Sequence, residues 1–119
     1  MNKKIILFFI LGFFYNPLLL AKDLHSLAKD CHLSAQNLIE LSQIQTDKTC
    51  QTELVYAHTN SDKAGKELTN NRQRKALLAL RDLLQSLNYA IAMDCKKKEV
   101  LLKEKENLVH IMSDIANPF

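Results

Sequence analysis

Three cysteines are the residues of this chain whose type and spacing best support covalent chemistry. Cys31, Cys50 and Cys95 lie far apart in the sequence and form no Cys-x-x-Cys motif, so neither a redox-active pair nor a cysteine-rich zinc site is indicated. In an exported protein, three cysteines favour one disulfide and one thiol left over. Which pair forms depends on where the helices place them.

Four histidines could in principle bind a metal ion. His25, His32, His58 and His110 include no pair spaced four apart, the spacing that places two imidazoles on one face of a helix. Cys31 and His32 are neighbours, so on a helix their side chains point about 100° apart. We predict surface or hydrogen-bonded histidines and no metal, haem or other cofactor.

Serine nucleophiles fare no better as candidates for catalysis. None of the six serines lies in a Gly-x-Ser-x-Gly setting, and the chain has only two glycines. A glycine-poor helical chain rarely builds an oxyanion hole. The acids are scattered among lysines, as on solvated helix faces. We therefore predict that the protein is not an enzyme.

The first 21 residues predict a secretory signal peptide. Lys3 and Lys4 precede an apolar run, Asn16 and Pro17 interrupt it, and the small Ala21 ends it, which is the pattern of a cleavable export signal. The alternative is an uncleaved membrane anchor, since residues 5–21 approach the length of a short spanning helix. We favour cleavage, which leaves a single domain of residues 22–119.

Cleavage would also change the charge. Without Lys3 and Lys4, the Lys+Arg count falls from 16 to 14 against 13 acids, and the net charge falls from +3 to +1. A nearly neutral chain gives no electrostatic reason to expect nucleic acid as a partner. The residue usage looks bacterial, so we predict a periplasmic or secreted protein, with membrane contact only if the first segment stays attached.

The elements that must position these residues are helices. The chain from Arg72 to Cys95 contains no glycine or proline, and its large apolar residues recur at steps of three and four, the helical spacing. This stripe comprises Leu77, Leu80, Leu84, Leu87 and Ile91, widened by Leu78, Leu83 and Ala90. Similar stripes predict helices over residues 23–45 and 48–68. The apolar spacing resumes after Cys95 and continues to about residue 116. The fold class is all-α, a small up-and-down bundle of three to four helices.

Two helix boundaries are less sharply defined by the sequence. Residues 59–65 are rich in side chains that prefer caps and turns, so we expect the second helix to break or fray there. Residues 72–116 could form one long helix or two. We favour a break near residues 96–99, because Lys98 and Lys105 would otherwise fall on the apolar phase.

The bundle topology favours a disulfide between Cys50 and Cys95. Cys50 follows the first turn and Cys95 precedes the last, and these turns share one end of an up-and-down bundle. With the middle turn near Asn70, Cys50 lies level with residue 90 or 91, about one helical turn from Cys95. Cys31 is then a buried free thiol. A Cys31–Cys95 bond, or no disulfide, remains the alternative.

The segment closed by Cys50 and Cys95 resembles the small periplasmic lysozyme-inhibitor domains. Leu80-Arg81 lies in its second half and Asp94-Cys95 closes it. The tryptophan and the Tyr-Arg pair of that pattern are absent. The resemblance covers under half of the chain and implies an inhibitor role.

With no site for catalysis, we predict that the protein acts by binding another protein, as an inhibitor, an immunity factor or an accessory of envelope machinery. The candidate contact residues lie on the second helix and are Tyr56, His58, Asn60, Asp62 and Lys66. The alternatives are a periplasmic stress chaperone, whose weak second helix would open to expose apolar surface, and a membrane-tethered helical protein.

Overall fold

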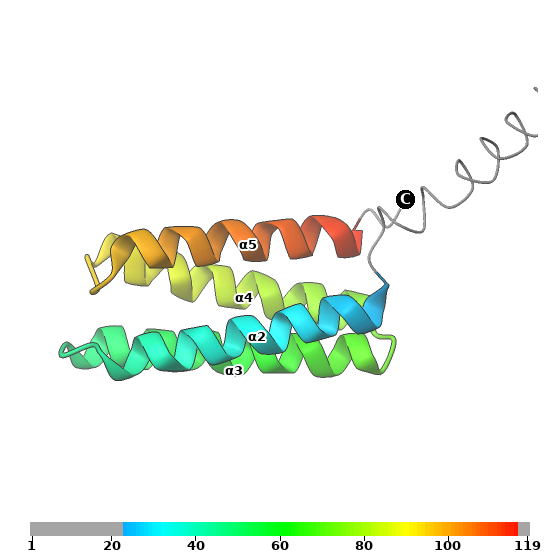
Figure 1. Ribbon diagram of the computed structural model, residues 1–119, viewed down its shortest axis with the longest axis horizontal. Coiled ribbons are helices and arrows are strands. Elements are labelled where there is room, and N and C mark those ends of the chain that lie inside the picture. The colour runs from blue at the N-terminus through cyan, green and yellow to red at the C-terminus, as the bar shows by residue number, and fades with distance from the viewer. Residues whose placement is uncertain (1–22, 117–119) are drawn as a thin grey trace, which may run out of the picture.

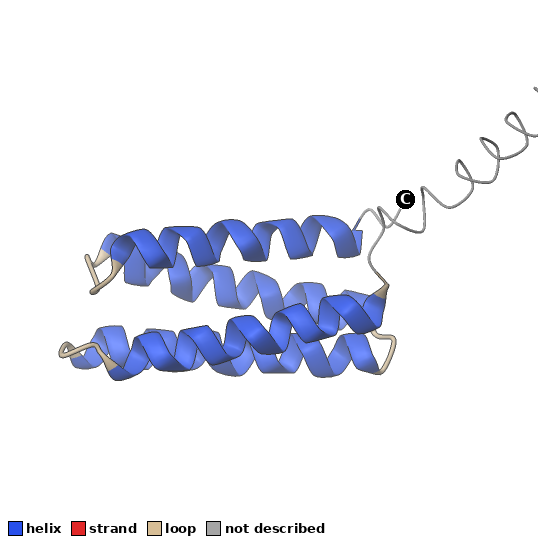
Figure 2. Ribbon diagram, in the orientation of Figure 1, coloured by secondary structure: helices blue, strands red, loops and turns tan. Residues whose placement is uncertain are grey.

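The part of the chain that the structure describes folds into four antiparallel helices. The structure, a computed structural model, describes residues 23–116. The helices are α2 (Leu24–Gln43), α3 (Lys48–Thr69), α4 (Gln73–Ala92) and α5 (Lys98–Ala116), which run up and down along a common axis (Figure 1). Within the described part, helices are joined by short loops and no strand occurs (Figure 2). The prediction of a small all-α bundle is confirmed, whereas the predicted signal peptide, residues 1–21, lies outside the described residues.

Short polar side chains and left-handed backbone positions set the helix ends. Asp23 begins α2 by accepting a hydrogen bond from the Ser26 amide at 2.7 Å, as an N-cap aspartate should. Asn71 and Asp94 adopt positive φ angles of 61° and 57° after α3 and α4, a conformation that asparagine and aspartate tolerate. The predicted break between the last two helices is therefore confirmed.

The second helix does not break where we expected. α3 continues through residues 59–65, because the polar side chains there find acceptors without leaving the helix. Thr59 Oγ1 donates to the Val55 carbonyl at 3.0 Å and Asn60 Nδ2 to the Tyr56 carbonyl at 3.1 Å. Ser61 Oγ donates to the Cys31 carbonyl on α2 at 2.7 Å. The prediction of a break was wrong, since these bonds replace the turn contacts that the same residues prefer elsewhere.

The core consists of leucines from all four helices, but the buried face of α4 is rotated from the predicted stripe. Leu80, Leu83 and Leu87 are completely buried. Leu77, Leu84 and Ile91 are only partly buried and pack at the edge of the core. Leu78, which we expected to widen the stripe, is 45% exposed. The small Ala76, Ala79, Ser86 and Ala90 take the remaining buried positions and let α4 approach its neighbours.

The four helix pairs around the bundle are packed unequally. α2 packs most closely on α3, and α3 on α4, whereas α2 and α5 make the fewest contacts of any adjacent pair. Among residues 23–116, no helix has the length and apolar character needed to cross a bilayer. The anchor alternative for residues 5–21 lies outside the described residues. The open seam of the described bundle is the one between its first and last helices.

Candidate functional site

A disulfide joins two turns at one end of the bundle. Cys50 lies in the first turn of α3 and Cys95 follows α4, with their Cα atoms 5.7 Å apart. The prediction that these two residues lie at bonding distance is confirmed, and the Cys31–Cys95 alternative is not observed. Asp47 caps α3 beside the disulfide by accepting from the amides of Thr49 and Cys50 at 2.7 and 3.2 Å.

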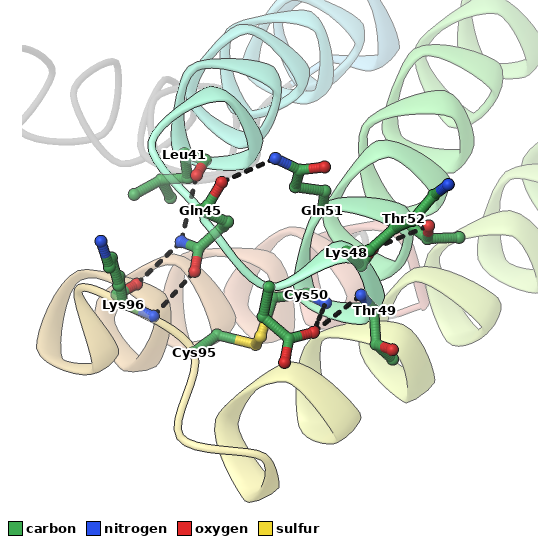
Figure 3. Close-up of a disulfide and its surroundings, with 10 residues drawn as sticks. Leu41, Gln45, Lys48, Thr49, Cys50, Gln51, Thr52, Cys95 and Lys96 are labelled. Carbon is green, nitrogen blue, oxygen red and sulfur yellow. Dashed lines mark hydrogen bonds between the residues drawn. A yellow bond between two sulfur atoms is a disulfide. The ribbon is translucent and has the colours of Figure 1, made fainter.

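Gln45 ties the same two turns together without a covalent bond. Its side chain is buried, and its Oε1 accepts from the Lys96 amide at 2.8 Å while its Nε2 donates to the Lys96 carbonyl at 3.0 Å (Figure 3). Nε2 also donates to the Leu41 carbonyl at 3.1 Å. One amide side chain thus satisfies both backbone groups of Lys96. Together with the disulfide, these bonds hold the two turns at this end of the bundle in place.

Cys31 is the remaining thiol and lies inside the core. The residue is fully buried on α2. Burial, reinforced by the nearby Asp30 carboxylate, raises the pKa of the Cys31 thiol from 9.0 to about 12. The thiolate, which is the reactive form, is therefore suppressed at neutral pH, and Cys31 behaves as a small apolar side chain.

We expect Cys31 in the folded protein to resist thiol reagents from pH 7 to pH 10. The raised pKa, about 12, keeps the thiol protonated across that range, whereas in the unfolded chain it ionises near its ordinary value. The rate of labelling by a chromogenic disulfide reagent checks this, with protein in 6 M guanidinium chloride as the control. A labelling rate that climbs steeply between pH 8 and pH 9 in the folded protein would contradict the burial of the thiol.

Two histidines from different helices contact one carboxylate on the outside of the α2–α3 pair. His32 Nδ1 lies 2.9 Å from Asp62 Oδ1, and His58 Nε2 lies 3.7 Å from Asp62 Oδ2. His58 Nδ1 is also 2.7 Å from the Ala35 carbonyl oxygen. His58 and Asp62 were predicted contact residues, whereas His32 was not. Sequence spacing could not reveal this cluster, because it depends on how α2 pairs with α3.

The cluster is built as a link between helices. Within residues 23–116, no group of three or more histidine, cysteine or acidic side chains is placed to hold a metal ion. The His32 ring lies over Gly65 on α3, where an added Cβ would come within 2.6 Å of Nε2. Because Gly65 has no side chain, the imidazole ring of His32 can pack directly against α3.

We expect Gly65→Ala to stabilise the protein by about 1 kcal/mol when His32 is already alanine, because alanine is the better helix former. In the native background the gain should be smaller or reversed, since the new methyl group must displace the His32 ring from Asp62. Denaturant melts of the two single variants and the double variant measure this difference. Equal gains in both backgrounds would show that the ring does not depend on the glycine.

A shallow hollow between α3 and α4 is flanked by two tyrosines. Tyr56 is 51% exposed and Tyr89 is 56% exposed, and both line a hollow of about 380 Å³. Glu53 and Asp82 add carboxylates to its wall. Tyr56 was a predicted contact residue, whereas Tyr89 was missed because its position next to Tyr56 depends on the pairing of α3 with α4.

The other predicted contact residues on α3 are not brought together with Tyr56. Asn60 is buried and donates to the Tyr56 carbonyl. Lys66 is exposed more than two turns further along the helix, and His58 and Asp62 belong to the cluster with His32. The predicted residues therefore divide between the tyrosine hollow, the histidine cluster, the buried Asn60 and the separately exposed Lys66.

A second hollow follows the open seam between α2 and α5. One part of it, about 280 Å³, is lined by Leu33, Ser34 and Glu104, among other residues. A further part, toward the disulfide end, again includes Glu104, together with Ile44 and Val100. We refer to the two parts as the α2–α5 cleft. No residue of this cleft was among the predicted contact residues.

Comparisons of the chain with protein-family models, with curated proteins and with solved structures find no match.

Proposed function

We propose that this is an exported, non-catalytic protein that binds another protein through its α3–α4 face. The observation that carries the proposal is the pair of half-exposed tyrosines, Tyr56 and Tyr89, on the rims of one hollow. Tyrosine is enriched at the energetic centres of protein interfaces, because its ring buries a large apolar area while its hydroxyl accepts and donates hydrogen bonds.

The scaffold supports this role because it holds the two rings on rigid helices. Tyr56 lies in the interior of α3 and Tyr89 in the last turn of α4, and α3 and α4 are among the most closely packed pairs in the bundle. Because the backbones of both residues are fixed before binding, ordering this surface costs only the side-chain freedom of the two rings. The inhibitor, immunity and accessory roles all require such a surface.

Export is the second part of the proposal. A disulfide between Cys50 and Cys95 is favoured in oxidising compartments outside the cytoplasm, which supports a periplasmic or secreted protein. Mass spectrometry of the mature N-terminus tests this directly. We expect a species that begins at Lys22 in the soluble envelope fraction, whereas an intact N-terminus in the membrane fraction would support the tethered alternative.

Affinity capture tests the tyrosine face. The oxidised protein, immobilised and exposed to envelope extract from its own host, should retain a specific protein, and Tyr56→Ala and Tyr89→Ala should each reduce its recovery at least tenfold. Leu102→Ala is the matched control, because Leu102 is an exposed residue on α5. Equal recovery by all variants, or no specific capture by folded native protein, counts against this surface.

The chaperone alternative rested on a weak second helix. Because α3 is continuous through residues 59–65, it gives no support for opening at that segment, and the chaperone alternative keeps only the apolar surface that the bundle exposes, which includes Leu33, Ile44 and Val100. Suppression of client aggregation, measured at acidic and neutral pH, distinguishes the two functions: a specific binding protein should show none at either pH.

A further inference from the structure

The α2–α5 cleft differs in charge from the rest of the chain. Its walls include the carboxylates of Asp30, Glu40, Glu104 and Asp114. Among the described residues, no lysine or arginine lines it, although the whole chain has 16 such residues against 13 acids. The cleft is therefore an acidic surface on a protein whose overall charge is positive.

Glu104 is the unusual member of this surface, because it is buried without a cation. Only 6% of it is exposed. Ser34 Oγ donates to Oε1 at 2.9 Å and Asn37 Nδ2 donates to Oε2 at 3.3 Å. Among residues 23–116, no lysine, arginine or histidine forms an ion pair with Glu104. Two neutral donors hold the carboxylate at the base of the cleft.

A buried carboxylate without a counter-charge is a costly arrangement. Burying an ionised group is unfavourable unless an opposite charge and hydrogen bonds compensate it. Here the hydrogen bonds are present and the opposite charge is absent. An arginine or lysine from outside would meet a carboxylate that is already oriented and shielded from water, where charge-assisted hydrogen bonds are strongest.

The shape and the rims of the cleft match a helix. Its two parts share Asn37 and Glu104, so they form one groove. From Asp30 to Ile44 it follows α2 for about 20 Å, or roughly four helical turns. Leu33, Ile44 and Val100 expose apolar surface along its edges. Exposed apolar rims around an acidic floor are complementary to a helix with apolar and basic stripes.

We propose that the α2–α5 cleft binds a basic amphipathic helix of a partner protein, with a lysine or arginine of that helix paired to Glu104. The loose packing of α2 on α5 lets the guest helix lie in the seam and cover apolar surface that the bundle leaves exposed. This surface involves none of the residues of the tyrosine hollow, so either surface can fail without the other.

A designed peptide tests the cleft. The probe is an 18-residue fluorescent peptide with leucines on one helical stripe and lysines and arginines on the other, and its partner peptide carries glutamates in place of the basic residues. Fluorescence anisotropy with the oxidised protein should show binding of the basic peptide that weakens as salt is added. The acidic peptide should not bind.

Variants locate the binding. Glu104→Gln keeps the size of the side chain and should weaken binding at least tenfold, whereas Glu106→Gln, which removes the same charge from an exposed position on α5, should change it less than twofold. Glu104→Gln should not lower the denaturation midpoint, since it removes a buried charge. Leu33→Lys on the exposed rim, with Leu102→Lys as its control, gives a second test that does not depend on the core.

Three results would overturn the proposal. The basic peptide could fail to bind. It could also lose the same affinity in the Glu104 and Glu106 variants, which would show diffuse electrostatic attraction only. Sedimentation could instead show a dimer that Leu33→Lys dissociates, which would assign the cleft to a second copy of the chain.

Discussion

Removing the disulfide by Cys50→Ala with Cys95→Ala should lower the free energy of unfolding by about 4 kcal/mol. The two cysteines are separated by 45 residues, and a closed loop of that length strongly restricts the unfolded chain. In the folded state the Gln45 bonds to Lys96 still hold the two turns together. The loss should therefore come mainly from the greater freedom of the unfolded chain.

Denaturant melts of oxidised native protein and of the double variant measure this difference. Cys31→Ala is the control for cysteine loss, because its thiol is buried and unbonded. It should cost about 1 kcal/mol, set by the small cavity it leaves. A Cys31 variant as destabilised as the double variant would contradict the assigned disulfide.

Leu80→Ala should cost about 3 kcal/mol, whereas Leu78→Ala on the same helix should cost less than about 0.5 kcal/mol. Leu80 is completely buried and Leu78 is 45% exposed, so the same change in composition creates a cavity at one site and none at the other. The helix propensity change is identical in the two variants. The difference therefore measures burial alone.

Chemical denaturation followed by circular dichroism is the appropriate measurement, since both variants should retain the helical signal of the native protein. Similar losses in the two variants would mean that Leu78 is covered. It would then belong to an interface in solution or to the wider stripe that the sequence suggested.

The helices could be predicted because their apolar residues recur at helical spacing, and the break before α5 because lysines interrupt that spacing. The continuity of α3 could not. It depends on hydrogen bonds such as that of Ser61 to the Cys31 carbonyl on α2, which exist only once the two helices are paired. The rotated buried face of α4 has the same origin. Its alanines are buried because neighbouring helices pack close to them, and the sequence of α4 alone does not show where those neighbours lie.

Candidate site residues divide in the same way. Tyr56 could be found as a large aromatic side chain in a polar segment. Tyr89 and His32 could not, because each becomes a candidate only through its neighbours on another helix. Glu104 did leave a signal in the sequence. It lies three residues after Leu101 and four before Leu108, both of which are buried. An acid on the apolar stripe of the last helix was thus a signal for the cleft, which the interpretation of the acids as solvated side chains did not use.

The position of the disulfide also determines how the protein would respond to mechanical force. The bond closes a ring that contains α3 and α4, while α2 and α5 lie outside it. The start of α2 and the end of α5 lie at the opposite end of the bundle from the disulfide (Figure 1). Tension applied there would peel these two helices away and stop at the ring. At about 3.5 Å per extended residue, the cross-link withholds roughly 160 Å of chain from stretching.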